Sequence, residues 1–182
     1  SRSATGLFVA LTILGTPAGL GIVVAIACAI ALVRGKPYRA LYLAGTAAVG
    51  ALLNVALKNV FERARPDLSV ALREASGFSF PSGHAMGSTI VFGALAYLAY
   101  RLPWPWRGRA ATIAGCATLA IGIAASRIYL GVHWISDVAA GIAAGGLWLV
   151  VSIVAYETFR RLRALRAQPR GPNRPGSGSL PP

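Results

Sequence analysis

Long apolar segments alternate with short polar loops along the chain. We expect helices over five ranges: 7–33, 40–57, 81–100, 110–125 and 135–158. Most of these segments come close to the roughly 20 residues that a helix needs to cross the hydrocarbon of a bilayer. The pattern therefore predicts an all-α fold, a polytopic membrane helix bundle with five apolar segments.

The first apolar segment is interrupted by the residues GTPAG at 15–19. Proline lacks the amide that a helix interior needs and glycine weakens a helix, so together they predict a kink or a break. We expect a short helix up to Leu14 and a spanning helix from about Ala18 to Val33. The sequence is compatible with a short helix that lies in the interface and with one that forms the end of a span.

The composition supports a location in the membrane. The chain has 182 residues, of which 55% are hydrophobic and 13% charged, and its mean hydropathy is +0.61. Soluble domains usually carry about 25% charged residues. The net charge of +13 could indicate nucleic-acid binding, but the basic residues lie mainly in short loops and near the C-terminus. That distribution is typical of membrane topology, so we expect a lipid bilayer and no nucleic acid as partner.

The basic residues also predict the orientation. They are concentrated in three regions: 34–39, 101–109 and the stretch from 160 onward. Because basic loops tend to remain in the cytoplasm, these regions are predicted to be cytoplasmic. The connections 58–83 and 126–137 should then face outward. Ser1 would also lie outside, so if the native chain starts inside, parity predicts about one further span upstream of Ser1.

The last fifteen residues, QPRGPNRPGSGSLPP at 168–182, are rich in proline, glycine and serine. Such a segment cannot bury enough apolar surface to offset the entropy lost on ordering. We therefore predict a membrane-embedded domain over 1–167 and a disordered cytoplasmic tail over 168–182.

The first of three polar stretches follows the second apolar segment and contains Lys58, Arg65 and Pro66. Arginine offers a planar fork that can bind two phosphate oxygens, and lysine offers a point charge. Taken alone, this stretch is more typical of basic side chains that extend from a helix end toward lipid headgroups.

The second stretch, Pro81-Ser82-Gly83-His84, opens the third apolar segment. Proline and serine in this position are ordinary signals for the start of a helix. A helix N-terminus is also a ready anion site, because its free backbone amides point outward. Ser82 can add a hydroxyl group, and Gly83 lets a ligand approach the backbone closely. We favour an anion site with His84 at its mouth.

The third stretch contains Ser126 and Arg127, then His133 and Asp137. Residues four apart share a face of a helix, so Asp137 can accept a hydrogen bond from the imidazole of His133. Such a bond fixes the tautomer and leaves the other ring nitrogen free to attack. The alternative is a pair that merely satisfies a partly buried histidine. Ionisable groups at the edge of hydrocarbon are costly, which favours a functional role.

Together the three stretches resemble the active-site pattern of the type 2 phosphatidate phosphatase family. These proteins are also called lipid phosphate phosphatases, and they share the pattern with vanadium haloperoxidases. The pattern reads K-x6-R-P, then P-S-G-H, then S-R-x5-H-x3-D. The chain matches it in residue type and spacing from Lys58 to Asp137.

The resemblance implies a role for each matched residue. His133 would attack phosphorus to form a phosphohistidine, and Asp137 would orient it. His84 would protonate the leaving oxygen and then act as base for the hydrolytic water. Five groups would hold the phosphoryl oxygens: Lys58, Arg65, Arg127, the Ser82 hydroxyl and the Gly83 amide. Fixed cations would take the place of magnesium, so we expect no metal and no cofactor.

The predicted function is an integral membrane phosphatase that acts on a lipid phosphate or diphosphate at the extracytoplasmic face of the cell membrane. For a bacterial source, the resemblance suggests phosphatidate, phosphatidylglycerol phosphate or a polyprenyl diphosphate such as undecaprenyl diphosphate as substrate. A vanadate-binding peroxidase or a lipid phosphotransferase could use the same residues. A channel or transporter with a charged pore is a further alternative, which the convergence of the ionisable groups on one face disfavours.

Overall fold

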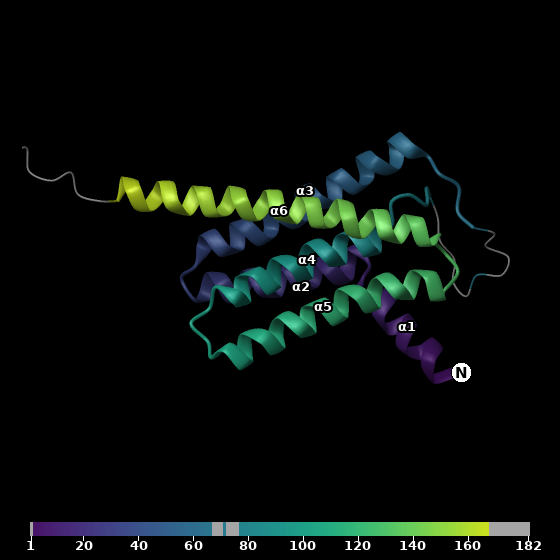
Figure 1. The fold of residues 1–182 in the computed structure, drawn as a ribbon, viewed down its shortest axis with the longest axis horizontal. Helices are drawn as coiled ribbons and strands as arrows, with labels where there is room; N and C mark the ends of the chain where they lie inside the picture. The colour runs from purple at the N-terminus through teal and green to yellow at the C-terminus, as the bar shows by residue number, and fades with distance from the viewer. Residues whose placement is uncertain (1, 67–70, 72–76, 168–182) are drawn as a thin grey trace, which may run out of the picture.

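The computed structural model describes residues 2–66, 71 and 77–167, and in these residues it contains six helices and no strand (Figure 1). The helices are α1 (Arg2–Leu14), α2 (Pro17–Val33), α3 (Pro37–Phe61), α4 (Gly83–Tyr100), α5 (Trp106–Tyr129) and α6 (Ile135–Arg166). The all-α fold, the five apolar segments and the break after Leu14 are thus confirmed. The predicted disordered tail at 168–182 lies outside the described residues.

Several helices extend beyond the apolar segments that predicted them. α5 runs on to Tyr129, so Arg127 lies in its last turn rather than in a loop. α6 continues to Arg166 through an arginine- and leucine-rich stretch. Arginine, leucine and alanine all favour helix, so helical structure persists where hydropathy ends.

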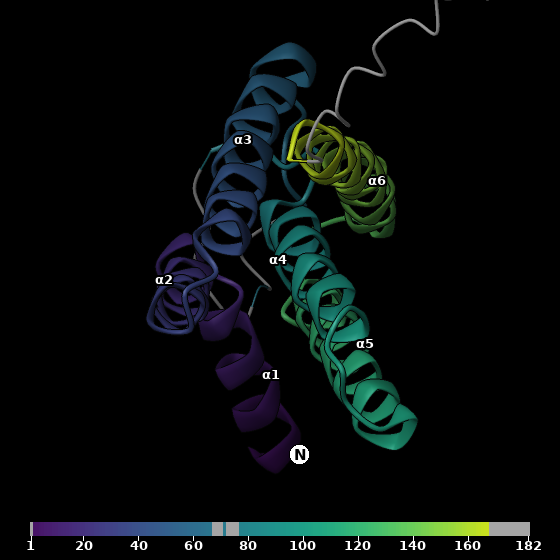
Figure 2. The ribbon, with the colours of Figure 1, turned by 90° about the vertical axis from the view of Figure 1, so that its left-hand side faces the viewer.

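α4 lies at the centre of the bundle and packs against α3, α5 and α6 (Figure 2). The approach of α6 depends on two glycines. A Cβ atom at Gly141 would lie 2.7 Å from the carbonyl oxygen of Ser82, and one at Gly145 would lie 2.8 Å from that of Met86. No side chain fits in this seam, so the backbones of α4 and α6 are in direct contact, as small residues on facing helices allow.

The outer surface of the bundle suits a bilayer. α3, α5 and α6 are each long and apolar enough to cross a membrane, and α1 with α2 meets the same test as a pair bent by 62°. Large apolar side chains face outward, for example Leu52 and Leu147, each 69% exposed. That the central helix α4 also crosses the membrane stays a prediction.

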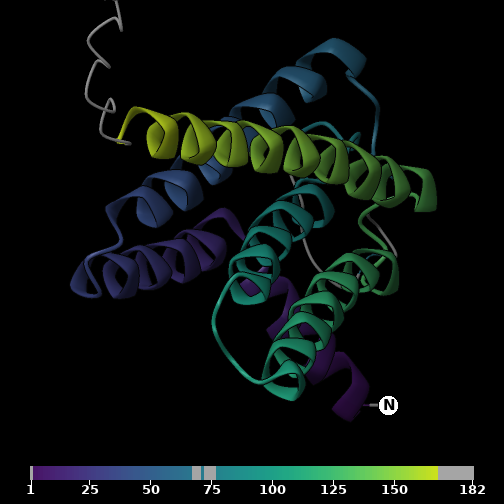
Figure 3. The same cartoon turned by 60° about the vertical axis from the view of Figure 1, so that its left-hand side comes forward.

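The two ends of the bundle differ in chemistry. One end gathers the C-termini of α3 and α5, the N-termini of α4 and α6, and the bend between α1 and α2 (Figures 1 and 3). The opposite end holds the basic α2–α3 and α4–α5 connections and the C-terminus of α6. All three polar stretches therefore meet at one end, away from the basic loops.

Candidate active site

A cavity of about 840 Å³ opens between α2, α3 and α4. Six of the eight predicted site residues line it: Lys58, Arg65, Gly83, His84, Arg127 and His133. The rest of its wall is largely small and apolar, with alanines of α3 and glycines of α2 and α4. The structure thus brings residues from three distant stretches to the polar end of one cavity.

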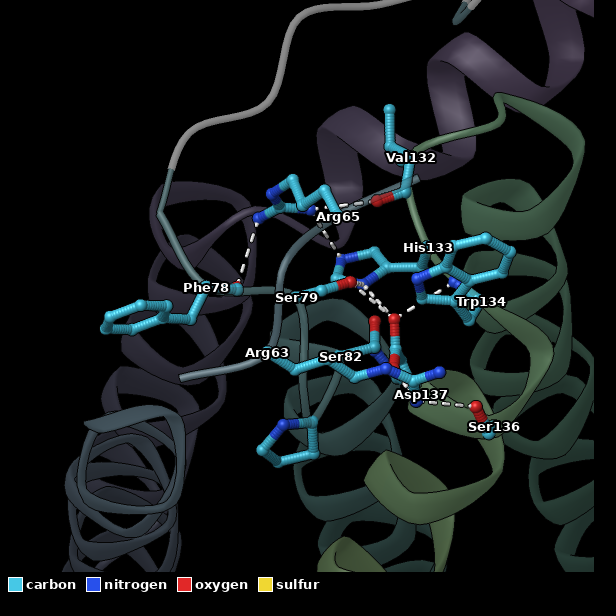
Figure 4. Close-up of polar contacts among 12 residues, drawn as sticks. Arg63, Arg65, Phe78, Ser79, Ser82, Val132, His133, Trp134, Ser136 and Asp137 are labelled. Atoms are coloured by element: carbon cyan, nitrogen blue, oxygen red, sulfur yellow. Dashed lines mark hydrogen bonds and ion pairs between the residues drawn. The ribbon is translucent and has the colours of Figure 1, made fainter. Parts of the chain in front are cut away.

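His133 and Asp137 form the predicted pair behind this cavity (Figure 4). His133 Nδ1 lies 3.4 Å from Asp137 Oδ2, and both side chains are buried. His133 precedes α6, so the two residues do not share a helix face. The pair forms because Asp137, in the first turn of α6, turns back to cap the helix. Its Oδ2 accepts a hydrogen bond from the Trp134 amide at 3.0 Å.

Two further residues bind Asp137, and the sequence interpretation did not assign them to the site. Arg63 Nη1 donates to Asp137 Oδ1 at 2.9 Å and to Ser136 Oγ at 2.8 Å. The buried Ser79 donates its hydroxyl to Asp137 Oδ2 and lies 3.3 Å from His133 Nδ1. The carboxylate is therefore held on both oxygens (Figure 4).

The position of Arg63 could have been inferred from the sequence. It stands two residues before Arg65 in a stretch that follows the end of α3. Alternate residues of an extended segment point to the same side, so both arginines can reach one region. Ser79 carries no comparable signal, because a single serine in a loop is ordinary.

Arg65 covers the other nitrogen of the His133 ring. Its Nη1 lies 3.2 Å from His133 Nε2 and donates to the carbonyl of Val132 at 2.9 Å. A guanidinium group can only donate, so Nε2 must accept and the ring proton belongs on Nδ1. In this tautomer Nε2 is the nitrogen that carries the lone pair, on a ring that lines the cavity beside Arg65.

His84 and Arg127 both meet Thr12 of α1. His84 Nε2 lies 3.1 Å from the Thr12 carbonyl oxygen. Arg127 is buried in the last turn of α5, and its Nη1 donates to the Thr12 hydroxyl. Thr12 itself is only 2% exposed. α1 therefore contributes to the site through Thr12, although the sequence analysis assigned no site residue to this helix.

Ser82 has a different environment from the one expected. Its side chain is fully buried and caps α4 by accepting a 3.5 Å hydrogen bond from the Ala85 amide. Its own amide donates to the carbonyl of Asp137 at 3.0 Å. Ser82 is not among the residues that line the cavity. The predicted contact between the Ser82 hydroxyl and phosphate stays a prediction, and the buried position of this hydroxyl does not favour it.

The pKa values of both histidines are lowered. Burial, together with the charges of Arg65 and Arg127, lowers the pKa of His133 to about 4. Burial and the Arg127 charge lower the pKa of His84 to about 3, with further contributions from His133 and Arg65. Both rings are therefore neutral near pH 7 in the absence of a ligand, and the polar end of the cavity is suited to an anion.

Comparison with known proteins gives relatives that are named as phosphatases. Residues 39–161 match the family model of the PAP2 superfamily. The chain is 40% identical over 115 residues to phosphatidylglycerophosphatase B of Bacillus subtilis (strain 168), which covers 62% of this chain and 55% of that protein. It is 38% identical over 128 residues to decaprenylphosphoryl-5-phosphoribose phosphatase of Mycobacterium tuberculosis (strain CDC 1551 / Oshkosh), which covers 68% and 64% respectively. The chain thus spans between half and two thirds of the length of these relatives.

The fold has a solved counterpart. The chain is similar to the crystal structure of a transmembrane PAP2 type phosphatidylglycerolphosphate phosphatase from Bacillus subtilis, with a TM-score of 0.82 and 30% sequence identity. The superposition covers 90% of this chain and 81% of that one. Together with the exposed apolar helices, this similarity shows a multi-pass membrane protein.

Proposed function

Because the chain belongs to the PAP2 superfamily, we propose that it is a membrane phosphatase that hydrolyses a lipid phosphate or diphosphate through a phosphohistidine intermediate. The observation that carries the proposal is the cavity, which joins two histidines and three cations at one end to a small-residue apolar wall below. A phosphate headgroup fits the first region and a hydrocarbon chain fits the second.

In the first step, His133 Nε2 attacks phosphorus. The new N–P bond forms as the bond to the leaving oxygen breaks, and His84, which takes a proton from the singly protonated substrate phosphate, gives that proton to the leaving oxygen. Asp137 holds Nδ1–H of His133 and stabilises the positive charge that develops on the ring. The lipid leaves as an alcohol from a monoester, or as a lipid phosphate from a diphosphate.

In the second step, water attacks the phosphohistidine. His84, now neutral, accepts a proton from the water as the new P–O bond forms and the N–P bond breaks. Inorganic phosphate then takes the proton from His84 and leaves, so both histidines are neutral again. Throughout, Lys58, Arg65 and Arg127 neutralise the charge on the equatorial oxygens, which is the main requirement of phosphoryl transfer.

This assignment predicts that the reaction needs no divalent cation. Addition of a chelator such as EDTA to the purified protein should leave the rate of phosphate release unchanged, because three fixed cations perform the neutralisation. A rate that falls on chelation and recovers when magnesium is restored would contradict this part of the proposal.

The lowered pKa values predict an activity profile displaced toward acid. Histidine is neutral above its pKa, so His133 can attack above pH about 4, and the rate should fall below that value. His84 is also neutral in the free protein, so its proton must arrive on a singly protonated phosphate. kcat/KM should therefore fall again above the second pKa of the substrate phosphate, about 6 for alkyl monoesters.

The origin of the alkaline limb can be measured with two substrates whose phosphate pKa values differ. If the proton arrives with the substrate, the limb in kcat/KM shifts by the same amount as the substrate pKa. A limb at the same pH for both substrates would show that His84 is protonated in the free protein.

The apolar wall predicts that tail length matters. Ala51 lies on α3 and lines the cavity about 10 Å, two helical turns, below Lys58. The substitution Ala51→Trp should lower kcat/KM for a long-chain lipid phosphate about 10-fold or more and spare a short-chain one. Ala56→Trp is the matched control, because Ala56 is exposed on α3 and is not among the lining residues.

The direct test of the function is a panel of lipid phosphates and diphosphates assayed in detergent. The relatives named above differ in lipid group, one a phosphatidylglycerol phosphate enzyme and the other a decaprenyl one, so the panel must include both glycerolipids and polyprenyl lipids. Activity restricted to water-soluble phosphates would contradict a lipid substrate.

We further propose that the site faces outward and α6 ends in the cytoplasm, a proposal supported by the basic loops at the opposite end.

A further inference from the structure

We infer that the break between α1 and α2 positions the proposed general acid. It frees the carbonyl of Thr12 to hold the His84 ring, so that Nδ1 of His84 is the nitrogen that faces the leaving oxygen. The inference rests on the proposed function of His84 and assigns a role to a segment that the sequence marked only as a kink.

The carbonyl is freed by the missing amide of Pro17. In a continuous helix the Thr12 carbonyl would accept from the amide of residue 16. Here the Thr16 amide donates to the Ile13 carbonyl at 3.2 Å, and the Thr16 hydroxyl donates to the same oxygen at 2.7 Å. Pro17 has no N–H to offer Ile13, so Thr16 serves it instead. The Thr12 carbonyl then accepts from His84.

This hydrogen bond fixes the tautomer of the neutral ring. A carbonyl can only accept, so Nε2 of His84, at 3.1 Å, must carry the proton. Nδ1 then has the lone pair that can take a proton from water, and in the imidazolium form it has the N–H that can donate to the leaving oxygen. The carbonyl plays the part toward His84 that Asp137 plays toward His133.

The break also provides the space that the ring needs. A Cβ atom at Gly15 would lie 2.8 Å from Cδ2 of His84, the ring carbon next to Nε2, and 2.4 Å from Cγ2 of Ile123. Any residue other than glycine must therefore displace the side chains of His84 and Ile123, and we expect the ring to move away from the Thr12 carbonyl. The requirement is specific to position 15, because nothing lies within 4 Å of a Cβ at Gly6 of α1.

α1 is anchored so that the carbonyl cannot drift. The Phe8 ring stacks on Tyr129 of α5 with centroids 4.2 Å apart, and Thr5 Oγ1 lies 3.2 Å from the Tyr129 hydroxyl. The Thr12 hydroxyl accepts a hydrogen bond from Arg127, which like Tyr129 belongs to α5. Thr12 is thus a positioning residue twice over, through its main chain for the acid and through its side chain for a phosphate-binding cation.

The tautomer can be observed directly, because the chain contains only two histidines. In protein labelled with ¹⁵N-histidine, the His84 signals are assigned by comparison with a His133→Gln variant. At neutral pH we expect His84 wholly in the Nε2–H form. Pro17→Ala restores an amide for Ile13 and allows Thr16 to return to Thr12, so it should give a mixture of tautomers. Gly6→Ala should not change the spectrum.

An Nδ1–H ring in the wild-type protein would overturn the inference. So would a Pro17→Ala protein in which His84 stays wholly Nε2–H.

Kinetics provides a second test. Proton donation matters for an alkyl phosphate and hardly matters for p-nitrophenyl phosphate, whose leaving group needs no proton. Gly15→Ala and Pro17→Ala should lower kcat/KM for the alkyl substrate about 10- to 100-fold and change kcat/KM for the nitrophenyl substrate less than about twofold. kcat/KM is the quantity to compare, because it reports the steps up to departure of the leaving group and not the later hydrolysis, in which His84 acts as base for both substrates. Thr12→Val keeps the carbonyl and loses only the hydroxyl, so it should raise KM for both substrates, and Thr12→Ser should restore KM.

The outcomes separate the inference from the function beneath it. Equal losses of kcat/KM on both substrates in the Gly15 and Pro17 variants would mean that the break only shapes the bundle, which overturns the inference. A wild-type protein that releases no phosphate contradicts the proposed function itself. So does a His84→Asn variant that loses the same factor of kcat/KM on both substrates.

Discussion

The His133→Ala protein is expected to release phosphate from its lipid substrate at least about 10⁴-fold more slowly than wild type. The substitution removes the nitrogen that attacks phosphorus, and no neighbouring group can replace it, because Arg65 only donates and Asp137 faces away behind the ring. The measurement is release of inorganic phosphate by purified protein in detergent. Ile135→Ala, a change at an apolar position two residues on that is 71% exposed, is the matched control.

The same variant tests the covalent intermediate. The wild-type protein is allowed to react with a substrate labelled in its phosphate group, and the reaction is then quenched. The chain should carry a label that is lost in acid and stable in base, as expected of an N–P bond. The His133→Ala protein should carry none. Retained activity, or a label that survives the substitution, would place the nucleophile elsewhere.

Asp137→Asn is expected to lower kcat about 10²- to 10⁴-fold while the protein still folds. The side chain of asparagine can donate as well as accept, so it no longer requires the proton to be on Nδ1 of His133. Part of the protein then carries the proton on Nε2 of His133, and such a ring cannot attack phosphorus. The change also weakens the hydrogen bonds from Ser79 and from Arg63, which is 41% exposed and can turn to water. We expect a loss in unfolding free energy of about 1–3 kcal/mol.

A matched control lies at the other end of the same helix. Glu157 is also a carboxylate on α6 and lies between Arg101 at 3.5 Å and Arg160 at 3.2 Å. Glu157→Gln should leave kcat unchanged, although it too removes a charge from ion pairs. Measured side by side, kcat and melting temperature separate the two roles. An Asp137→Asn protein with a lower melting temperature and normal kcat would show that Asp137 is structural.

Much of the fold could be predicted because it depends on local chemistry. Apolar runs mark the helices, and proline with glycine at 15–19 marks the break, since these effects act over a few residues. Helix ends were less accurate, as at Arg127 and Arg166, because polar residues with high helix propensity continue a helix beyond its apolar part.

The candidate site was predicted where residue type and spacing carry the chemistry, and missed where long-range packing does. The two histidines and the cations meet as the three stretches indicated. Thr12 was missed because its contribution comes partly from a main-chain carbonyl, a group that every residue possesses. Ser79 depends on a loop that folds back over α6, and Ser82 is directed away from the cavity by capping α4. Such features become visible only in three dimensions.

The glycine seam between α4 and α6 has a consequence for how this protein can vary. His84 belongs to α4, and the Asp137 that orients His133 belongs to α6, so the separation of acid and nucleophile follows from how closely the two main chains touch at Gly141 and Gly145. Peptide backbones have fixed dimensions, whatever side chains surround them. Positions that face lipid can therefore diversify to suit membranes of different composition without altering the dimensions of the reaction centre, and a single methyl group added at Gly141 should disturb it more than many changes on the outside.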